Sequence, residues 1–559
     1  MTAKSRTTRW AVAGLLIILG FSVAWRWHTI GPIPGLGAIE GTIIRSGEPE
    51  PLDCDEAAYA YMGRRVVRGD VLYRDLTENK PPLGYWLYTL AVAIGGANEL
   101  TIRVMAIPYV LLTIGLVWWI ALKLGGPGAA CLAAGVFAVA DTDPYLFGNG
   151  SNMEHFLNLF SVASLALIVG AGEGARHRRG LILAAGACLA MATLVKQVAV
   201  THGLVSAVFL MVPTQGSTRT IGARLGDIAA IGLGFAIPWI VAIGVLIVPG
   251  AGRSAYDDIV RFAAAIVRDL PPPLNAPPKL VRWVVGNADP GGRLPWPFGK
   301  TTYLVWWGAG LWPFWLASLP ATARLVGESD RRRVLLGAWT VSAWFQVFLP
   351  GQFWPHYYLL PVPGAAIAIA LWSIDLSRSL RTRPIRSVVL GFGLLAAIGW
   401  SGWIQLRDYL GTTPAEITTR YKGGRQWVDL RAIGRDLAKR SKVWSHPTLF
   451  VWGWQSPLYL YSGLDSPSRH FFANELLKAH ANDDHPLVRP WIDEIMHDLQ
   501  ARPPALVMAG DVPFPALKRF LSARYLPSTL HMNTPDGRGL WVDREHYAAF
   551  HAGLARRFQ

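Results

Sequence analysis

Several ionisable side chains lie within or beside strongly apolar segments, where charged residues are costly and usually mark function. A carboxylate there can accept a proton from a hydroxyl nucleophile, and cations with hydroxyl donors can hold a phosphate whose negative charge is growing. These residues are Asp55, Glu56 and Lys80 in a long polar loop, and Asp141, Asp143, Glu154, His155, Lys196, His202 and His356 near the ends of apolar segments. Their placement toward one face of a membrane predicts a polar cavity that opens on that face.

Each of these residues also has a structural interpretation. Asp141, Asp143 and His202 could be solvated interfacial residues, and Lys196 could extend its side chain to water along apolar surface. The Asp-Glu pair of the loop could stabilise the N-terminus of a surface helix through the helix dipole. The one-sided placement of the whole set favours the cavity.

The composition indicates a membrane protein. The chain has 559 residues, of which 52% are hydrophobic and 16% charged, whereas soluble domains are roughly 25% charged. The 25 tryptophans fit aromatic belts at two membrane interfaces. Cys54, Cys131 and Cys188 form neither a metal-binding spacing nor an even disulfide framework.

Eleven apolar segments approach the length of a membrane span. The first follows a basic tail with Lys4, Arg6 and Arg9, as in a signal peptide, but it is longer than a signal core and predicts an uncleaved helix. The segments lie near 10–27, 101–124, 127–147, 154–171, 180–195, 197–213, 226–248, 302–320, 333–350, 357–373 and 386–404.

The connecting loops predict a cytosolic N-terminus. Alternate loops, at 176–179, 219–224, 324–333 and 378–386, are rich in arginine, whereas the opposite hairpins 148–153 and 351–355 have no Lys or Arg. This is the positive-inside asymmetry. It accounts for much of the formal net charge of +16, and no nucleic-acid partner is expected because the sequence contains no recognisable nucleic-acid-binding module.

The predicted fold is a multi-pass α-helical membrane protein with about eleven transmembrane helices. We expect a transmembrane domain over 1–404 and a small extracytoplasmic α/β domain over 405–559. Amphipathic helices are predicted near 55–69 and 81–96 in the first outer loop, 28–100, and a second outer loop, 249–300, is rich in proline. The α/β domain has strand-like runs at 448–454, 505–510 and 539–544, with helices near 424–441 and 513–525.

An ordered set of short motifs runs through most of residues 1–410 and continues into the tail. They are Asp55-Glu56 with Tyr59, Gly69-Asp70, Lys80-Pro81-Pro82-Leu83, Arg103, Asn152-x-Glu154, Leu194-Val195-Lys196, His356-Tyr357-Tyr358 and Trp452-Gly453-Trp454-Gln455. The set resembles the polyprenyl-phosphate-dependent sugar transferases of the glycosyltransferase C superfamily. The most similar groups are the dolichyl-phosphate-mannose protein mannosyltransferases and the bacterial aminoarabinose transferases that modify lipid A.

The resemblance implies an inverting transfer of a sugar from a polyprenyl-phosphate donor to an acceptor hydroxyl at the extracytoplasmic face of the plasma (inner) membrane. It implies Asp55 as general base with Glu56 in support. Lys196, His356, Tyr357 and Tyr358 would bind the donor phosphate, and Tyr59, Lys80, Arg103, Asp143 and Glu154 would position the substrates. No cofactor or metal is expected, since the lipid-linked sugar is a substrate and the sequence has no calcium-loop or HExxH pattern.

Other interpretations remain open. A transporter or lipid flippase also has many spans and a polar interior, although its sites tend to lie near the midplane between repeats. A membrane scaffold or sensor would act through residues 405–559. The acceptor could be a protein, a glycolipid or a polysaccharide. Relatives of the aminoarabinose type carry an arginine where this chain has Ala58, which removes one expected phosphate contact.

Overall fold

The computed structural model describes residues 3–30, 48–172, 175–213, 219–270, 311–350, 352, 354–379, 382, 384–530, 534 and 536–552. The proline-rich part of the predicted second outer loop therefore lies outside the described residues. The chain forms two compact units. The bundle unit comprises Met1–Glu50, Arg103–Ala242 and Pro272–Ile417, and the mixed unit comprises Pro51–Ile102, Ile243–Pro271 and Thr418–Gln559.

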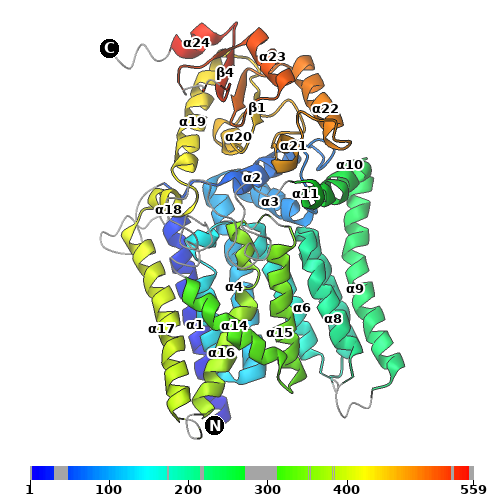
Figure 1. Ribbon diagram of the computed structural model, residues 1–559, viewed down its shortest axis with the longest axis vertical. Coiled ribbons are helices and arrows are strands. Elements are labelled where there is room, and N and C mark those ends of the chain that lie inside the picture. Colours follow the sequence, from blue (N-terminus) through cyan, green and yellow to red (C-terminus); the bar gives the residue numbers. More distant parts are fainter. Residues whose placement is uncertain are drawn as a thin grey trace. The chain divides into compact units, whose positions relative to one another are not determined.

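Long helices make up the bundle unit (Figure 1). They are α1 (Ala3–Ile30), α4 (Glu99–Gly125), α5 (Pro127–Ala140), α6 (Met153–Gly170), α7 (Arg178–Val195), α8 (Val200–Met211), α9 (Ile221–Ile247), α14 (Trp312–Val326), α15 (Arg331–Phe348), α16 (Val362–Arg378) and α17 (Pro384–Gly411). Short 3₁₀ turns, η1 (Pro144–Leu146), η2 (Gln197–Ala199) and η5 (Pro355–Leu359), lie between some of them. All eleven predicted apolar segments coincide with helices in their described parts.

Not every predicted segment forms a full-length span within the described residues. Among the described residues, seven helices are long and apolar enough to cross a membrane. The helices α5 and α8 have only 14 and 12 residues, fewer than the ~20 that cross a bilayer core, and α15 begins with three arginines. The seven are Arg9–Ile30, Glu99–Gly125, Met153–Gly170, Arg178–Val195, Ile221–Ile247, Pro355–Arg378 and Val388–Arg407.

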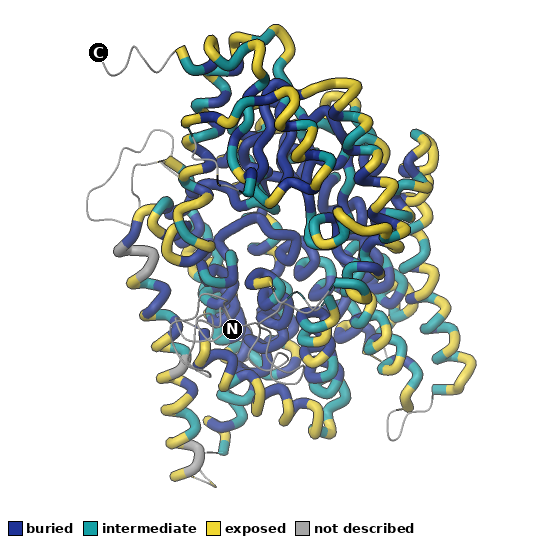
Figure 2. The backbone as a smooth tube through the Cα atoms, turned by 45° about the horizontal axis from the view of Figure 1, so that its top comes forward, coloured by how far each residue is buried: buried dark blue, intermediate teal, exposed yellow. Residues whose placement is uncertain are grey.

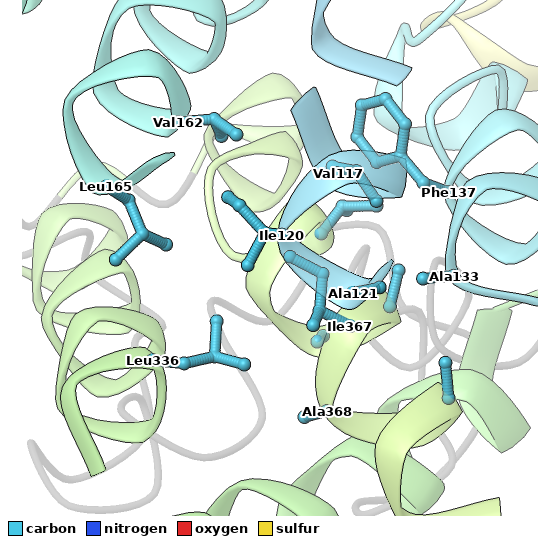
Figure 3. Close-up of a cluster of buried hydrophobic side chains, with 14 of the residues drawn as sticks. Val117, Ile120, Ala121, Ala133, Phe137, Val162, Leu165, Leu336, Ile367 and Ala368 are labelled. Atoms are coloured by element: carbon cyan, nitrogen blue, oxygen red, sulfur yellow. The ribbon is translucent and has the colours of Figure 1, made fainter. Parts of the chain in front are cut away.

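The bundle has an apolar interior and apolar outer faces. Side chains from α4, α5, α6, α15 and α16, such as Ile120, Phe137 and Leu165, pack into one cluster (Figure 3). On the outside of α9, Ile240 and Val241 are 66% and 60% exposed. Exposed stretches of the tube follow the outer helices of this unit (Figure 2). Such surfaces suit contact with lipid tails. Lipid tails are as apolar as these side chains, so burying the side chains inside the protein gives no hydrophobic gain.

The mixed unit combines short helices with one sheet. Its helices are α2 (Cys54–Val67), α3 (Leu83–Gly95), α10 (Gly252–Tyr256), the π-helix η3 (Asp257–Phe262), α11 (Ala263–Asp269), α18 (Pro414–Tyr421, which begins in the bundle unit), α19 (Gln426–Arg440), η7 (Ser441–Val443), α20 (Pro457–Ser462), α21 (Glu475–Ala479), α22 (Val488–Ala501), α23 (Pro515–Arg524) and α24 (Tyr547–Ala552). Its strands are β1 (Leu449–Trp452), β2 (Leu506–Ala509), β3 (Tyr525–Pro527) and β4 (Gly539–Asp543).

The four strands form a sheet in the order β1-β2-β4-β3. β1 and β2 are parallel, with Leu449 opposite Leu506, and β4 runs antiparallel to both β2 and β3. Every residue of β1 and β2 is buried, as expected of strands covered on both faces. The predicted strands and helices of the tail are therefore confirmed, and β3 is an addition.

Most of the first outer loop groups with the C-terminal residues. The sequence-based division placed the loop in the 1–404 domain, whereas residues 51–102 belong to the mixed unit. The contacts explain this. The ring of Tyr61 in α2 stacks on that of Tyr459 at 4.6 Å between centroids, and Arg64 pairs with Asp465 at 2.8 Å.

Candidate active site

The Asp-Glu pair lies in the first turn of α2. Asp53 is the N-cap: its Oδ1 accepts a hydrogen bond from the Glu56 N–H at 2.9 Å, and Glu56 Oε2 accepts one from the Asp53 N–H at 3.4 Å. This reciprocal capping box fixes the start of the helix. Glu56 is fully buried in it, whereas Asp55 is half-buried. The two neighbouring acids therefore have different surroundings.

The cap itself carries an unusual carboxyl group. Burial, followed by the charges of Glu56 and Asp55, raises the pKa of Asp53 to about 8. One of its oxygens accepts the cap hydrogen bond, and the other has no hydrogen-bond partner among the described residues. Asp53 thus keeps its proton between about pH 4 and pH 8, where an ordinary carboxyl group is ionised.

Aromatic hydroxyls lie near Asp55, and a lysine lies next to one of these aromatic rings. Burial, and then the charge of Asp55, raise the pKa of Tyr59 well above its usual value, and Asp55 also contributes to the raised pKa of Tyr85. The Lys80 ammonium lies 2.9 Å from a Glu78 oxygen and 5.3 Å from the centre of the Tyr59 ring. The structure thus gathers three predicted site residues, Asp55, Tyr59 and Lys80, around the same part of α2.

The loop that carries Lys80 is tied to the C-terminal part of the mixed unit. Tyr73, at a φ of 67°, donates its hydroxyl to the Lys80 carbonyl at 2.7 Å. Arg469 donates to the Tyr73 carbonyl at 3.1 Å, and the Thr77 N–H donates to the Arg469 carbonyl at 3.1 Å. Asp258, buried in the π-helix η3, lies 4.0 Å from Arg469. These contacts fix the backbone on both sides of Glu78 and Lys80.

A second cluster lies in the bundle unit, where α7 ends. Lys196 is buried, forms an ion pair with Glu154 of α6, and has its ammonium 4.1 Å from the centre of the Tyr357 ring. The rings of His356 and Tyr357 meet edge to face at 4.9 Å. Four predicted residues are therefore together here. Tyr358, in contrast, faces Trp344 within the apolar core, with ring centres 6.1 Å apart.

The remaining predicted residues of the bundle unit have structural partners. Asp143 caps η1 by accepting from the Tyr145 and Leu146 N–H groups at 2.8 and 3.3 Å. Arg103 pairs with Glu50 at 3.5 Å. His202 stacks on Trp339 with ring centres 4.2 Å apart. Asp143, His202 and Asp141 are at most 1% exposed, so none of them is a solvated interfacial residue.

Two buried residues were missed by the sequence reasoning. Arg26 donates to Asp141 at 2.5 Å, and His155 lies 3.5 Å from the same carboxylate. Glu50 accepts from Asn149 at 2.5 Å in addition to pairing with Arg103. An arginine inside the first apolar segment is the signal that could have identified Arg26. Glu50 lies in a polar loop and gives no such signal.

Within the ranges that the structure describes, no group of three or more His, Cys, Asp or Glu side chains is placed to hold a metal ion. Metal independence stays a prediction.

The comparisons with known proteins identify the fold. Residues 79–241 match the sequence model of the dolichyl-phosphate-mannose-protein mannosyltransferases. By sequence the chain matches no curated protein. By structure it is similar to ArnT from Cupriavidus metallidurans bound to undecaprenyl phosphate, with a TM-score of 0.55 at 16% identity over 96% of this chain and 98% of ArnT. The chain has the ArnT fold.

Two further structures support this result. ArnT in the apo state covers the same shares of the two chains with a TM-score of 0.52 at 17% identity. The apo oligosaccharyltransferase of Archaeoglobus fulgidus has a TM-score of 0.50 at 13% identity, over 96% of this chain and 74% of that one. Together with the family match, the ArnT fold confirms the predicted multi-pass architecture and the predicted resemblance to polyprenyl-phosphate-dependent glycosyltransferases.

Proposed function

We propose that this protein transfers a sugar from a polyprenyl-phosphate donor to an acceptor hydroxyl at the extracytoplasmic face, with inversion at the anomeric carbon and with Asp55 as general base. The observation that carries the proposal is the half-buried Asp55 carboxylate near Tyr59, whose ring lies next to the Lys80 ammonium, in a chain with the ArnT fold. The match of residues 79–241 to protein mannosyltransferases supports sugar transfer. ArnT bound to undecaprenyl phosphate supports a lipid-phosphate donor.

The chemistry needs a base and a stabilised leaving group. The acceptor oxygen forms a bond to the anomeric carbon while the bond from that carbon to the phosphate oxygen breaks. The acceptor proton passes to the Asp55 carboxylate, and the polyprenyl phosphate leaves with the electron pair of the broken bond. Because this is one displacement without a covalent enzyme intermediate, the configuration at the anomeric carbon inverts.

The position of Asp55 on α2 suits it to the role of general base. It lies in the first turn of a helix whose N-terminal dipole stabilises negative charge. Glu56 is occupied by the capping box, which supports a helix-positioning role. Lys80 is neutralised in part by Glu78, and we propose that this pair orients polar groups of the substrates near Asp55.

For the donor phosphate we propose Lys196 with His356 and Tyr357. The support is a buried ammonium with an aromatic hydroxyl and an imidazole beside it, since charge-assisted donors in a low-dielectric setting bind phosphate strongly. Glu154 forms an ion pair with Lys196. A bound phosphate would share the ammonium with that carboxylate. Tyr358 is better explained as part of the apolar core.

The test is a label-transfer assay with purified full-length protein. Radiolabelled polyprenyl-phosphate sugars would be incubated with the protein and with peptide, glycolipid and polysaccharide acceptors in turn. The proposal predicts label on one acceptor class, with the new bond of opposite anomeric configuration to the donor. Transport of labelled lipid across a vesicle membrane without transfer or hydrolysis would instead identify a flippase.

A further inference from the structure

A basic hollow in the bundle unit is lined by residues 175–180, by Arg219 and by the first turns of α9. Its volume is about 610 Å³. The charged and titratable residues that line it are Arg176, His177, Arg178, Arg179, Arg219 and Asp227. Four arginines against one aspartate leave a formal charge of +3 with the histidine neutral. A hollow of this charge attracts a compact anion.

One buried carboxylate holds two of these arginines in place. Asp227 is fully buried, and its Oδ2 accepts from Arg178 Nε at 3.0 Å and from Arg219 Nη2 at 2.8 Å. Arg219 also donates to the Ala223 carbonyl at 3.1 Å. The two guanidinium groups are therefore fixed before any ligand arrives, which lowers the entropic cost of binding. Arginines that serve only to orient the chain in a membrane need no such arrangement.

The start of α7 adds to the positive potential. This helix of 18 residues begins at Arg178 and has no side-chain cap. Gly180, in its first turn, lines the hollow. The positive end of the helix dipole favours an anion at this position. Cationic side chains, a preorganising carboxylate and a helix end thus converge on one space.

This hollow is remote from the Lys196 cluster. It adjoins the beginning of α7, whereas Lys196 follows the end of the same helix, about 27 Å away along its axis. The arginine-rich loops place it at the cytosolic leaflet by the positive-inside rule. Basic pockets between helices at that surface bind anionic lipid headgroups.

We infer that this hollow is a binding site for a phosphate group, either that of an anionic phospholipid headgroup or free phosphate. A test of this phosphate site does not depend on the proposed glycosyl transfer, since none of the residues that line the hollow belongs to the proposed active site.

Full-length protein in nanodiscs of phosphatidylcholine with a minor fraction of phosphatidylglycerol provides the test. Native mass spectrometry would count retained phosphatidylglycerol for wild type and for Arg176→Ala/Arg179→Ala, which leaves both arginine contacts to Asp227 intact. If each arginine contributes about fivefold to the affinity, the double variant should bind phosphatidylglycerol roughly 25-fold more weakly than wild type. The matched control, Arg332→Ala/Arg378→Ala, removes two exposed arginines from the start of α15 and the end of α16, which the positive-inside rule assigns to the same face, and should retain lipid like wild type.

Competition with inorganic phosphate separates the two sources. Displacement of the lipid by phosphate alone identifies a site for free phosphate, and resistance to it identifies the headgroup; either result upholds a phosphate site. Equal retention by wild type and Arg176→Ala/Arg179→Ala, with unchanged melting temperature, would overturn the inference. An equal loss in the control variant would also overturn it, because general surface charge would then explain binding.

Discussion

At the scale of single residues, the bundle unit buries its charges in partnered groups. Glu154 with Lys196, Asp141 with Arg26, and Glu50 with Arg103 are each almost completely buried. Removing one member of such a pair leaves an uncompensated charge and costs about 3–5 kcal/mol. A loss of activity after a single substitution therefore mixes stability with chemistry, and variants must be designed to separate the two.

Variants of Lys196 and Glu154 can separate the loss of stability from the loss of donor binding. Lys196→Met alone should lower the melting temperature, because Glu154 is then buried without its cation. Lys196→Met with Glu154→Gln removes both charges and should recover most of the lost stability. If Lys196 binds the donor phosphate, the double variant stays at least tenfold weaker in donor affinity, measured by binding of a radiolabelled polyprenyl-phosphate sugar. Wild-type affinity in the stable double variant would contradict the assignment, and Arg332→Ala serves as the unaffected control.

Asp53 makes a testable contribution to pH dependence. Its pKa is about 8 in the folded protein and about 4 in an unfolded chain. Between these values the folded state binds more protons, so this group's contribution to stability falls as the pH rises from about 4 to about 8. Asp53→Asn retains an oxygen to cap the Glu56 N–H and removes the titration. The melting temperature of the variant should therefore fall less than that of wild type between about pH 5.5 and pH 8.5.

The pH dependence of the melting temperature is also measured for a control variant. Asp493→Asn removes an exposed carboxylate of α22 and should keep the wild-type pH profile. Identical profiles for wild type and Asp53→Asn would show that Asp53 does not titrate in this range.

At this scale, the sequence identified residues by type and not by partner. Asp55, Tyr59 and Lys80 could be grouped because they follow one another in one loop. Lys196, Glu154 and His356 could be assigned to the same membrane face because each lies at a segment end. The pairing of Glu50 with Arg103 could not be predicted, since it depends on the folded path of a polar loop. Tyr358 lies among apolar side chains, because adjacent residues in a 3₁₀ turn face different surroundings, and its contact with the donor phosphate stays a prediction.

At the scale of elements, two glycines allow α7 and α9 to approach closely. A Cβ built on Gly186 would lie 2.1 Å from the Ile231 carbonyl oxygen of α9, and one on Gly234 would lie 1.9 Å from the Leu183 carbonyl oxygen of α7. Helices in membranes associate through such small residues, because close backbone packing replaces the hydrophobic effect as the source of stability. The pair α7 and α9 therefore depends on these two positions.

Gly234→Ala should separate the two helices. Neither contact is to a flexible side-chain end, so the backbone itself must shift, at a cost of about 1–3 kcal/mol or more. The expected result is a lower melting temperature in detergent. Gly232→Ala is a matched control on the same helix, since its Cβ would meet nothing within 4 Å. An equal effect of the two substitutions would contradict specific packing at Gly234.

Elements were easier to predict than their lengths. Hydrophobic runs and their polar boundaries located the helices of the bundle unit, the helices α2, α3, α19 and α23, and the strands β1, β2 and β4, because periodicity is a local property. The three-residue strand β3 could not be anticipated, since its sequence, Tyr525–Pro527, forms a strand only by pairing with β4. The short helices α5 and α8 were predicted as longer spans because apolar residues continue into the 3₁₀ turns next to them.

At the scale of the whole molecule, the arginine-rich loops predict the orientation of the chain. We predict a cytosolic N-terminus and extracytoplasmic residues 405–559. A reporter enzyme that is active only outside the cytosol, fused to the C-terminus, should be active, and the same reporter inserted in the loop at 176–179 should be silent. Activity in the reverse pattern would exclude an extracytoplasmic Asp55.

The central claim is that Asp55 removes the proton from the acceptor, and one comparison tests it most directly. Single-turnover transfer from a radiolabelled polyprenyl-phosphate sugar would be measured for wild type, Asp55→Asn and Asp493→Asn, with donor binding and melting temperature determined for each. The claim predicts that Asp55→Asn loses transfer by a factor on the order of a hundred or more while it binds donor and melts like wild type, and that Asp493→Asn is unaffected. Near-normal transfer by a well-folded Asp55→Asn would contradict the claim.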